Sequence, residues 1–184
     1  MRLTSGSPAP VFRVTDVFGT SRALSDYRGK RLLISFFRYS QCAICNLRVH
    51  HMIELYQEFR SRGLEMLAVF ESPRDNVVSN VNKQNVPFAL VADPEARLYE
   101  LFGVENSQEK VTAPPPDPER LQAQIAEANA LGYPLQREEG GNFFRMPADF
   151  VIGPTGLLEA AFYSEAIGAH LPWDQVEGLL AVVQ

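Results

Sequence analysis

The two cysteines of this chain, Cys42 and Cys45, are three residues apart, and the 184-residue sequence contains no others. Disulfide frameworks that stabilise small domains use more cysteines at wider spacings. Two cysteines at this spacing are typical of redox chemistry, in which one thiolate attacks and the second thiol closes a disulfide, or of half a metal site. The pair is therefore the first candidate for chemistry in the sequence.

The segments around the pair predict that Cys42 lies at the start of a helix. Leu32 to Phe37 is a nearly continuous apolar run, which indicates a buried central strand. After the cysteines, apolar residues recur at helical spacing until Gly63. A helix start stabilises anions and lowers the pKa of a thiol from about 8.5 to roughly 3.5–7.5. We therefore expect Cys42 to be the nucleophilic thiolate and the more exposed of the two thiols.

Cys45 lies one helical turn after Cys42 on the same side of the helix, so it can reach Cys42 with little backbone movement. An oxidant attacked by Cys42 would leave an intermediate that Cys45 resolves. Arg38, four residues before Cys42, is the nearest cation to stabilise the thiolate or orient a peroxide, and Arg48 is a weaker candidate. The alternative is a pair of inert buried cysteines beside a solvated arginine.

His50 and His51 raise a second alternative, a metal site formed with both cysteines. Adjacent residues on a helix point about 100° apart, so one short segment can hardly present all four side chains tetrahedrally. Ordinary placement on an amphipathic helix is the simpler interpretation of the two histidines. We expect neither a metal nor another cofactor.

The rest of the chain alternates between predicted strands and helices, which indicates an α/β fold with parallel crossovers. The predicted strands are 11–14, 32–37, 64–70, 88–91, 149–152 and 157–163, with a hairpin signal at 153–156 joining the last two. Three dipeptides are typical of helix starts: Ser72-Pro73, Asp93-Pro94 and Asp117-Pro118. A terminal helix is expected from near Pro172.

The segment from about 104 to 145 departs from this alternation. It begins with a polar stretch and a run of prolines, and a helix from Asp117-Pro118 to Gly132 carries Leu121 and Ile125 on one face. The segment is too small for a separate domain. We therefore expect one domain over residues 1–184, with a helical insertion at about 104–145 before the late β-hairpin.

The composition excludes several classes of protein. With 46% hydrophobic and 21% charged residues the chain is an ordinary globular sequence, and the apolar runs are too short to span a membrane. The net charge is −5 and basic residues form no dense run, so we expect neither nucleic acid nor membrane as a partner. The first residues lack the apolar stretch of a secretory signal, which predicts a cytoplasmic protein.

Several segments resemble the peroxiredoxin superfamily of alkyl hydroperoxide reductase C and thiol-specific antioxidant proteins, in the same order along the chain. They are residues 7–12, 24–33, 88–94, 102–104 and 150–156. The resemblance is closest to a peroxiredoxin-like branch with an Arg-x-x-x-Cys-x-x-Cys segment, here Arg38 to Cys45. It implies a thioredoxin-like α/β fold, a central mixed sheet flanked by helices, with Cys42 as the peroxidatic nucleophile.

The sequence departs from typical peroxiredoxins around the first cysteine. Their Pro-x-x-x-Thr-x-x-Cys segment has its proline at the position of Ser35 and its threonine at Tyr39. Their late arginine falls at Pro147, where thioredoxins place a cis-proline, and Arg145 is nearby but offset. Peroxide reduction needs donors aimed at the leaving oxygen, a role for which Arg38 is the candidate substitute.

Tyr39, Arg145 and Pro147 are therefore the candidate substrate-binding residues. We expect Pro147 to lie against the cysteine pair and the Met146–Pro147 bond to be cis, which an X-Pro bond permits at about 0.5–1 kcal/mol. Such a bond would expose backbone groups to an extended substrate that contains a disulfide. A trans bond would remove this anchor.

Three functions are consistent with these residues. The first is a thiol-dependent reductase of hydrogen peroxide or organic hydroperoxides, with a Cys42 sulfenic acid resolved by Cys45 and recycled by a thioredoxin-type dithiol. The second is a protein disulfide oxidoreductase that uses the same cysteines. The third is a redox-sensing interaction module, and a homodimer is compatible with all three.

Overall fold

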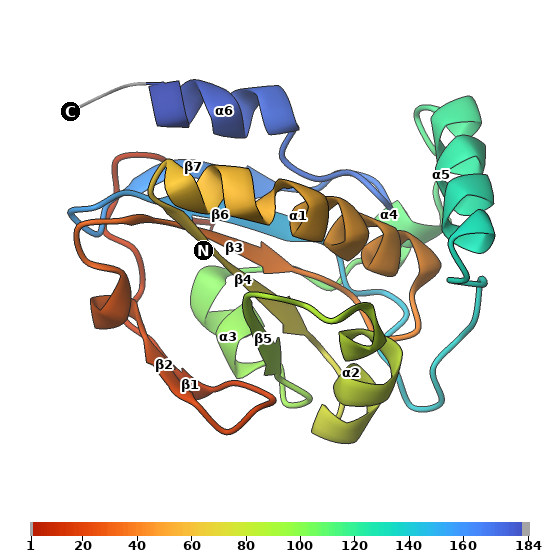
Figure 1. Ribbon diagram of the computed structural model, residues 1–184. Helices are drawn as coiled ribbons and strands as arrows, with labels where there is room; N and C mark the ends of the chain where they lie inside the picture. The colour runs from red at the N-terminus through yellow and green to blue at the C-terminus, as the bar shows by residue number, and fades with distance from the viewer. Residues whose placement is uncertain (1, 182–184) are drawn as a thin grey trace.

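The computed structural model describes residues 2–181, and its centre is a five-stranded mixed sheet (Figure 1). The strands lie in the order β5-β4-β3-β6-β7; their bounds are β3 (Arg31–Phe36), β4 (Leu64–Phe70), β5 (Ala89–Ala92), β6 (Ala148–Ile152) and β7 (Leu158–Tyr163). β3, β4 and β5 run parallel, whereas β6 and β7 are antiparallel to their neighbours. A separate hairpin pairs β1 (Arg13–Thr15) with β2 (Ser21–Ala23).

β3 is the central strand and ends just before the cysteine segment. It is paired on both edges, so that Ile34 lies between Leu67 of β4 and Phe150 of β6. Helices cover both faces of the sheet, which leaves the last five residues of β3 fully buried. This double burial explains why the apolar run is continuous rather than alternating.

Helices lie on both sides of the sheet (Figure 1). Leu33 and Phe37 pack in the core under α1 and α6, whereas Phe36 packs against Tyr99 and Phe102 of α3 on the opposite face. None of the helices within residues 2–181 is long and apolar enough to cross a membrane. The helices are α1 (Ala43–Ser61), α2 (Arg74–Asn80), α3 (Arg97–Phe102), α4 (Gln108–Thr112), α5 (Pro118–Ala130) and α6 (Trp173–Ala181), with 3₁₀ turns η1 (Leu24–Tyr27) and η2 (Asn82–Gln84).

The local signals predicted the right kinds of element, but several starts differ in the structure; α3, for example, begins at Arg97 and not at Asp93-Pro94. α5 begins at Pro118, and the Asp117 carboxylate accepts the N–H of Arg120 at 2.9 Å, as the dipeptide predicts. The prediction that Ser72 caps α2 is wrong, because its hydroxyl donates to Glu138 of the insertion instead. The first strand starts later than expected, and Val11 is 84% exposed.

The insertion packs against the start of α1 through α5. Ala128 of α5 is buried against Ala43 and Leu47 of α1, and the two helices are in direct contact near the end of β3 (Figure 1). The expected insertion helix is confirmed, whereas the short α4 was not predicted. The insertion is therefore placed beside the cysteine segment.

Asp149 on β6 is a fully buried carboxylate that anchors the segment before α6. Its Oδ2 lies 2.9 Å from Nδ1 of His170 and accepts the N–H of Leu171 at 2.7 Å. Burial opposes ionisation, but the charge and hydrogen bond of His170, with the charge of Arg48, outweigh it and lower the pKa of Asp149 to about 2. The ionised carboxylate therefore stabilises the fold.

We expect Asp149→Asn to lower the free energy of unfolding by roughly 3 kcal/mol at neutral pH, because it breaks a buried pair. Since the folded-state pKa is depressed, this stabilisation is complete above the unfolded pKa of about 3.9 and is lost as pH falls toward 2. Denaturant titrations at several pH values measure it. The exposed Asp75→Asn is the control, and an equal loss at all pH values would contradict the assignment.

Candidate active site

Cys42 occupies the N-cap of α1, as predicted. Its Sγ accepts the backbone N–H of Cys45 at 3.4 Å, and both cysteines are free thiols. The turn that leads into the helix is held by Asn46, whose side-chain amide donates to the carbonyls of Ser40 and Cys42 at 2.7 and 3.1 Å. The end of β3 and the first turn of α1 therefore fix the sulfur of Cys42 above the helix start.

The two thiols differ in acidity in the direction that the sequence predicts. The hydrogen bond from the Cys45 thiol, helped by the charge of Arg38 and two backbone N–H groups, outweighs burial and lowers the pKa of Cys42 to about 7. Burial and the neighbouring Cys42 raise the pKa of Cys45 well above its ordinary value. Cys42 is therefore the thiol that becomes a thiolate first.

Both thiols are buried, so the expected difference in exposure is very small. Cys42 is 4% exposed and Cys45 is 3% exposed. The helix start alone would leave Cys42 open to solvent, but the insertion packs over it. Cys42 nevertheless borders a cavity, and Cys45 is not among the residues that line it.

Arg38 is buried beside Cys42 and is held by the insertion. One of its terminal nitrogens, Nη2, donates to the carbonyl of Phe143, and its guanidinium carbon lies 4.7 Å from the centre of the Phe143 ring and 5.2 Å from that of Tyr39. Its Nε is buried and has no hydrogen-bond partner among the described residues. Arg38 thus brings a positive charge and a spare N–H donor to the site.

A cavity of about 330 Å³ opens onto Cys42. Its floor contains Arg38 and Tyr39, two of the residues predicted from the sequence. Burial, followed by the charge of Cys42, raises the pKa of Tyr39 to about 12, so this phenol stays neutral at physiological pH. The remaining walls are mostly apolar and come largely from the insertion; they are Ile44, Leu121, Ile125, Leu135, Gln136, Arg137, Phe143 and Ile167.

Glu138 fastens the insertion to the cysteine segment. Its buried carboxylate accepts hydrogen bonds from the backbone N–H and hydroxyl of Ser40, from the hydroxyl of Ser72 and from the side chain of Asn76. The backbone at Gly141 lies close to the side chain of Tyr39, and a Cβ added at Gly141 would lie 3.1 Å from the Tyr39 Cβ. Sequence patterns did not mark Glu138, because its partners lie far away in the chain.

The prediction of a cis Met146–Pro147 bond is wrong, because all peptide bonds within residues 2–181 are trans. Met146 donates its N–H to the carbonyl of Glu105, and the Pro147 carbonyl accepts the N–H of Ser164. The chain therefore enters β6 extended, and its backbone groups are already paired within the protein. Pro147 is buried but is not among the residues that line the cavity.

Arg145 also lies outside the cavity. Its Nε and Nη2 form a two-pronged ion pair with the Glu71 carboxylate at 2.6 and 3.3 Å, and its Nη1 donates to the carbonyl of Val104. These contacts use the guanidinium to join the residue that follows β4 to both ends of the insertion. The structure thus brings Cys42, Cys45, Arg38 and Tyr39 together, whereas Arg145 is engaged by Glu71 and Val104. Pro147 directly precedes Ala148, which pairs with Phe36 at the end of β3.

The two histidines of α1 have ordinary partners. Nε2 of His51 lies 3.0 Å from the Glu127 carboxylate of α5, and His50 lies 3.6 Å from Glu54 on its own helix. Within the part of the chain that the structure describes, histidine, cysteine and acidic side chains form no group of three or more that could hold a metal ion. Arg48, the weaker candidate cation, points instead toward Leu171 and Trp173.

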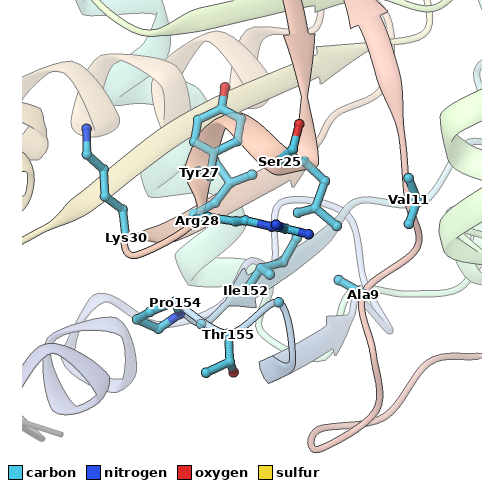
Figure 2. Close-up of a pocket in the computed structure, with 13 residues that line it drawn as sticks. Ala9, Val11, Ser25, Tyr27, Arg28, Lys30, Ile152, Pro154 and Thr155 are labelled. Atoms are coloured by element: carbon cyan, nitrogen blue, oxygen red, sulfur yellow. The ribbon is translucent and has the colours of Figure 1, made fainter.

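A separate depression of about 240 Å³ lies where β3 begins, at the other end of the strand from Cys42 (Figure 2). Figure 2 shows Arg28 extending across it, with Thr155 of the late hairpin on the opposite side. None of its lining residues is a cysteine or a histidine. The candidate chemistry is therefore confined to the end of β3 that carries the cysteines.

The sequence profile of the AhpC/TSA family matches residues 5–161, which include both cysteines and the insertion. The chain belongs to the AhpC/TSA family. Among its AhpC/TSA relatives, the thiol-disulfide oxidoreductase ResA of Geobacillus thermodenitrificans (strain NG80-2) is 33% identical over 100 residues. The match covers 54% of this chain and 57% of ResA, so the chain spans little more than half of that relative.

Solved structures confirm the thioredoxin-like α/β fold that the resemblance implied. Peroxidoxin BcpB from Mycobacterium tuberculosis superimposes with a TM-score of 0.69 at 14% identity, covering 100% of this chain and 99% of that one. The thioredoxin domain of a thiol-disulfide oxidoreductase from Bacteroides vulgatus gives 0.57 at 15% identity, covering 97% and 99%. The AhpC/TSA fold alone therefore leaves the substrate undetermined.

We expect iodoacetamide to alkylate Cys42 before Cys45, with a rate that rises with pH around 7, because the Cys42 thiolate forms first. Arg38→Gln shifts this profile to higher pH, whereas Arg38→Lys, which keeps the charge, shifts it less. Mass spectrometry after short exposures measures the order. Preferential labelling of Cys45 would reverse the assignment of the two thiols.

Proposed function

We propose that this AhpC/TSA protein is a thiol-dependent peroxidase with Cys42 as its peroxidatic residue. One observation carries the proposal: the more acidic thiol is buried at the base of a cavity of about 330 Å³. A cavity of this size admits a small hydroperoxide, whereas the strand of a protein disulfide would have to displace the insertion. The mostly apolar walls favour organic hydroperoxides over hydrogen peroxide.

In the first step the Cys42 thiolate attacks the terminal oxygen of the hydroperoxide. An S–O bond forms and the O–O bond breaks, which oxidises Cys42 to a sulfenic acid and releases an alkoxide that is protonated to the alcohol. The leaving oxygen needs a donor, because negative charge develops on it as the O–O bond breaks. The unpartnered Nε of Arg38 and its charge are available for this role.

In the second step Cys45 attacks the sulfur of the sulfenic acid. A disulfide forms, and the hydroxyl group leaves as water after taking up a proton. An external dithiol of the thioredoxin type then reduces the disulfide. Because Cys45 is 3% exposed, this last exchange requires the start of α1 or the insertion to open.

Disulfide exchange with a protein is the second candidate, and the similarity to ResA favours it. Two features oppose it here: Cys42 is buried, and the backbone at Met146 and Pro147 is already hydrogen-bonded. Consumption of cumene hydroperoxide in the presence of thioredoxin and thioredoxin reductase tests the peroxidase. Turnover of insulin disulfides without peroxide consumption would favour the second candidate, and inactivity in both assays would favour the redox-sensing module.

We expect Cys45→Ser to accumulate a sulfenic acid on Cys42 after one equivalent of hydroperoxide, because the residue that closes the disulfide is missing. Cys42→Ser removes the reaction with hydroperoxide altogether. Trapping with dimedone followed by mass spectrometry detects the intermediate. A Cys45→Ser protein that still turned over normally with thioredoxin would exclude Cys45 as the resolving residue.

We expect Ile125→Asn to lower the ratio of kcat/KM for cumene hydroperoxide to that for hydrogen peroxide by about tenfold, because it replaces an apolar wall with a polar one. Ala126→Asn, on the exposed side of the same helix, is the matched control and leaves the ratio unchanged. An unchanged ratio in Ile125→Asn would show that the insertion does not select the substrate.

A further inference from the structure

A second cavity, of about 320 Å³, lies between α1, α5 and the segment 168–173. Ile44 lines both this cavity and the one at Cys42. Gly168 closes the gap between them: its φ is +75°, and an added Cβ would lie 3.0 Å from Cγ2 of Ile44. The second cavity contains neither cysteine, so its chemistry is separate from the proposed peroxidase reaction.

The basic side chains of this cavity outnumber its acidic ones. Arg48, Arg120, His51 and His170 line it, whereas Glu127 is its only carboxylate among the lining residues that the structure describes, and Glu127 contacts His51 at 3.0 Å. Behind the wall, the buried carboxylate of Asp149 is in contact with His170. Neither arginine forms an ion pair within residues 2–181, and the nearest acidic charge to Arg48 is that of Asp149 behind the wall.

Arg48 is held in place before any ligand arrives. Its guanidinium carbon lies 3.5 Å from the centre of the Trp173 ring, and Nη2 donates to the carbonyl of Leu171 at 2.7 Å. Its Nε is buried without a partner, so much of its donor capacity is unused. Burial outweighs the charge of Asp149 and, with a smaller contribution from the like charge of Arg120, lowers the pKa of Arg48 to about 10, which leaves it charged at neutral pH.

An anion in this cavity would give the buried, unpartnered Nε of Arg48 a charge-assisted hydrogen bond, and Arg120 at the rim adds a second positive charge. The rest of the wall, Trp173, Leu47 and Ile44, is apolar and offers a surface for a carbon skeleton. We propose that this cavity binds a small organic carboxylate, with the carboxylate between Arg48 and Arg120 and the apolar body against Trp173. Its position next to the insertion makes it a ligand site separate from Cys42.

Trp173 is the chain's single tryptophan, so its fluorescence reports on this cavity. Titration of the reduced protein with benzoate is expected to give a saturable change in Trp173 emission, and benzamide, a neutral analogue of similar shape, none. Equal binding of benzamide would overturn the proposed recognition of charge. Inorganic phosphate binding as tightly as benzoate would overturn the proposed contact with an apolar body.

Arg120→Gln is expected to weaken benzoate binding by about tenfold, as loss of a charge-assisted hydrogen bond does. Because Arg120 is exposed at the rim, this variant keeps the fold, whereas Arg48→Met also removes the contacts to Leu171 and Trp173. Arg60→Gln, which removes an exposed charge of α1 outside the cavity, is the matched control and binds normally. Unchanged binding by Arg120→Gln, or no saturable signal with the unmodified protein, would refute the site.

Discussion

The N-cap position of Cys42 is the constraint on which the site depends. Its sulfur accepts the N–H of Cys45, and both thiols lie on one helical turn. The hydrogen bond from the Cys45 thiol to Cys42 then makes the first thiol more acidic than the second. The position exists because β3, paired on both edges, ends at Phe36, and because Asn46 turns the chain by binding the carbonyls of Ser40 and Cys42. The end of the central strand thus positions Cys42, and its neighbours in the first turn of α1 lower the pKa of its thiol.

The insertion completes this site from the outside. It supplies the carbonyl of Phe143 to Arg38 and the carboxylate of Glu138 to Ser40, both within the turn that precedes Cys42. Burying a carboxylate is costly unless its oxygens are hydrogen-bonded, and Glu138 has neutral donors from Ser40, Ser72 and Asn76. The insertion is therefore part of the active-site architecture, because the same contacts that hold it down also orient the cysteine segment.

The sequence predicted features that depend on neighbouring residues and missed those that depend on distant ones. The strand before Cys42 and the helix start at Pro118 follow from local chemistry, and the structure confirms them. The acidity of Cys42 depends on neighbouring residues as well, because Cys45 supplies the main hydrogen bond. The burial of Cys42 and the role of Ser72 depend on Glu138 and its neighbours, dozens of residues away. Next to the trans Met146–Pro147 bond, the N–H of Met146 donates to the carbonyl of Glu105. This contact also joins residues far apart in the chain, so no pattern around the proline predicts it.

The insertion over Cys42 has opposite effects on the two halves of the proposed cycle, the reaction with hydroperoxide and the reduction of the disulfide. The cavity admits a small hydroperoxide, but the burial of both cysteines hides their disulfide from a protein reductant. The turn at Glu138 is held by hydrogen bonds to neutral groups, each worth roughly 0.5–3 kcal/mol. Releasing this turn alone therefore costs less than unfolding the sheet beneath, which makes it the part of the insertion expected to open first.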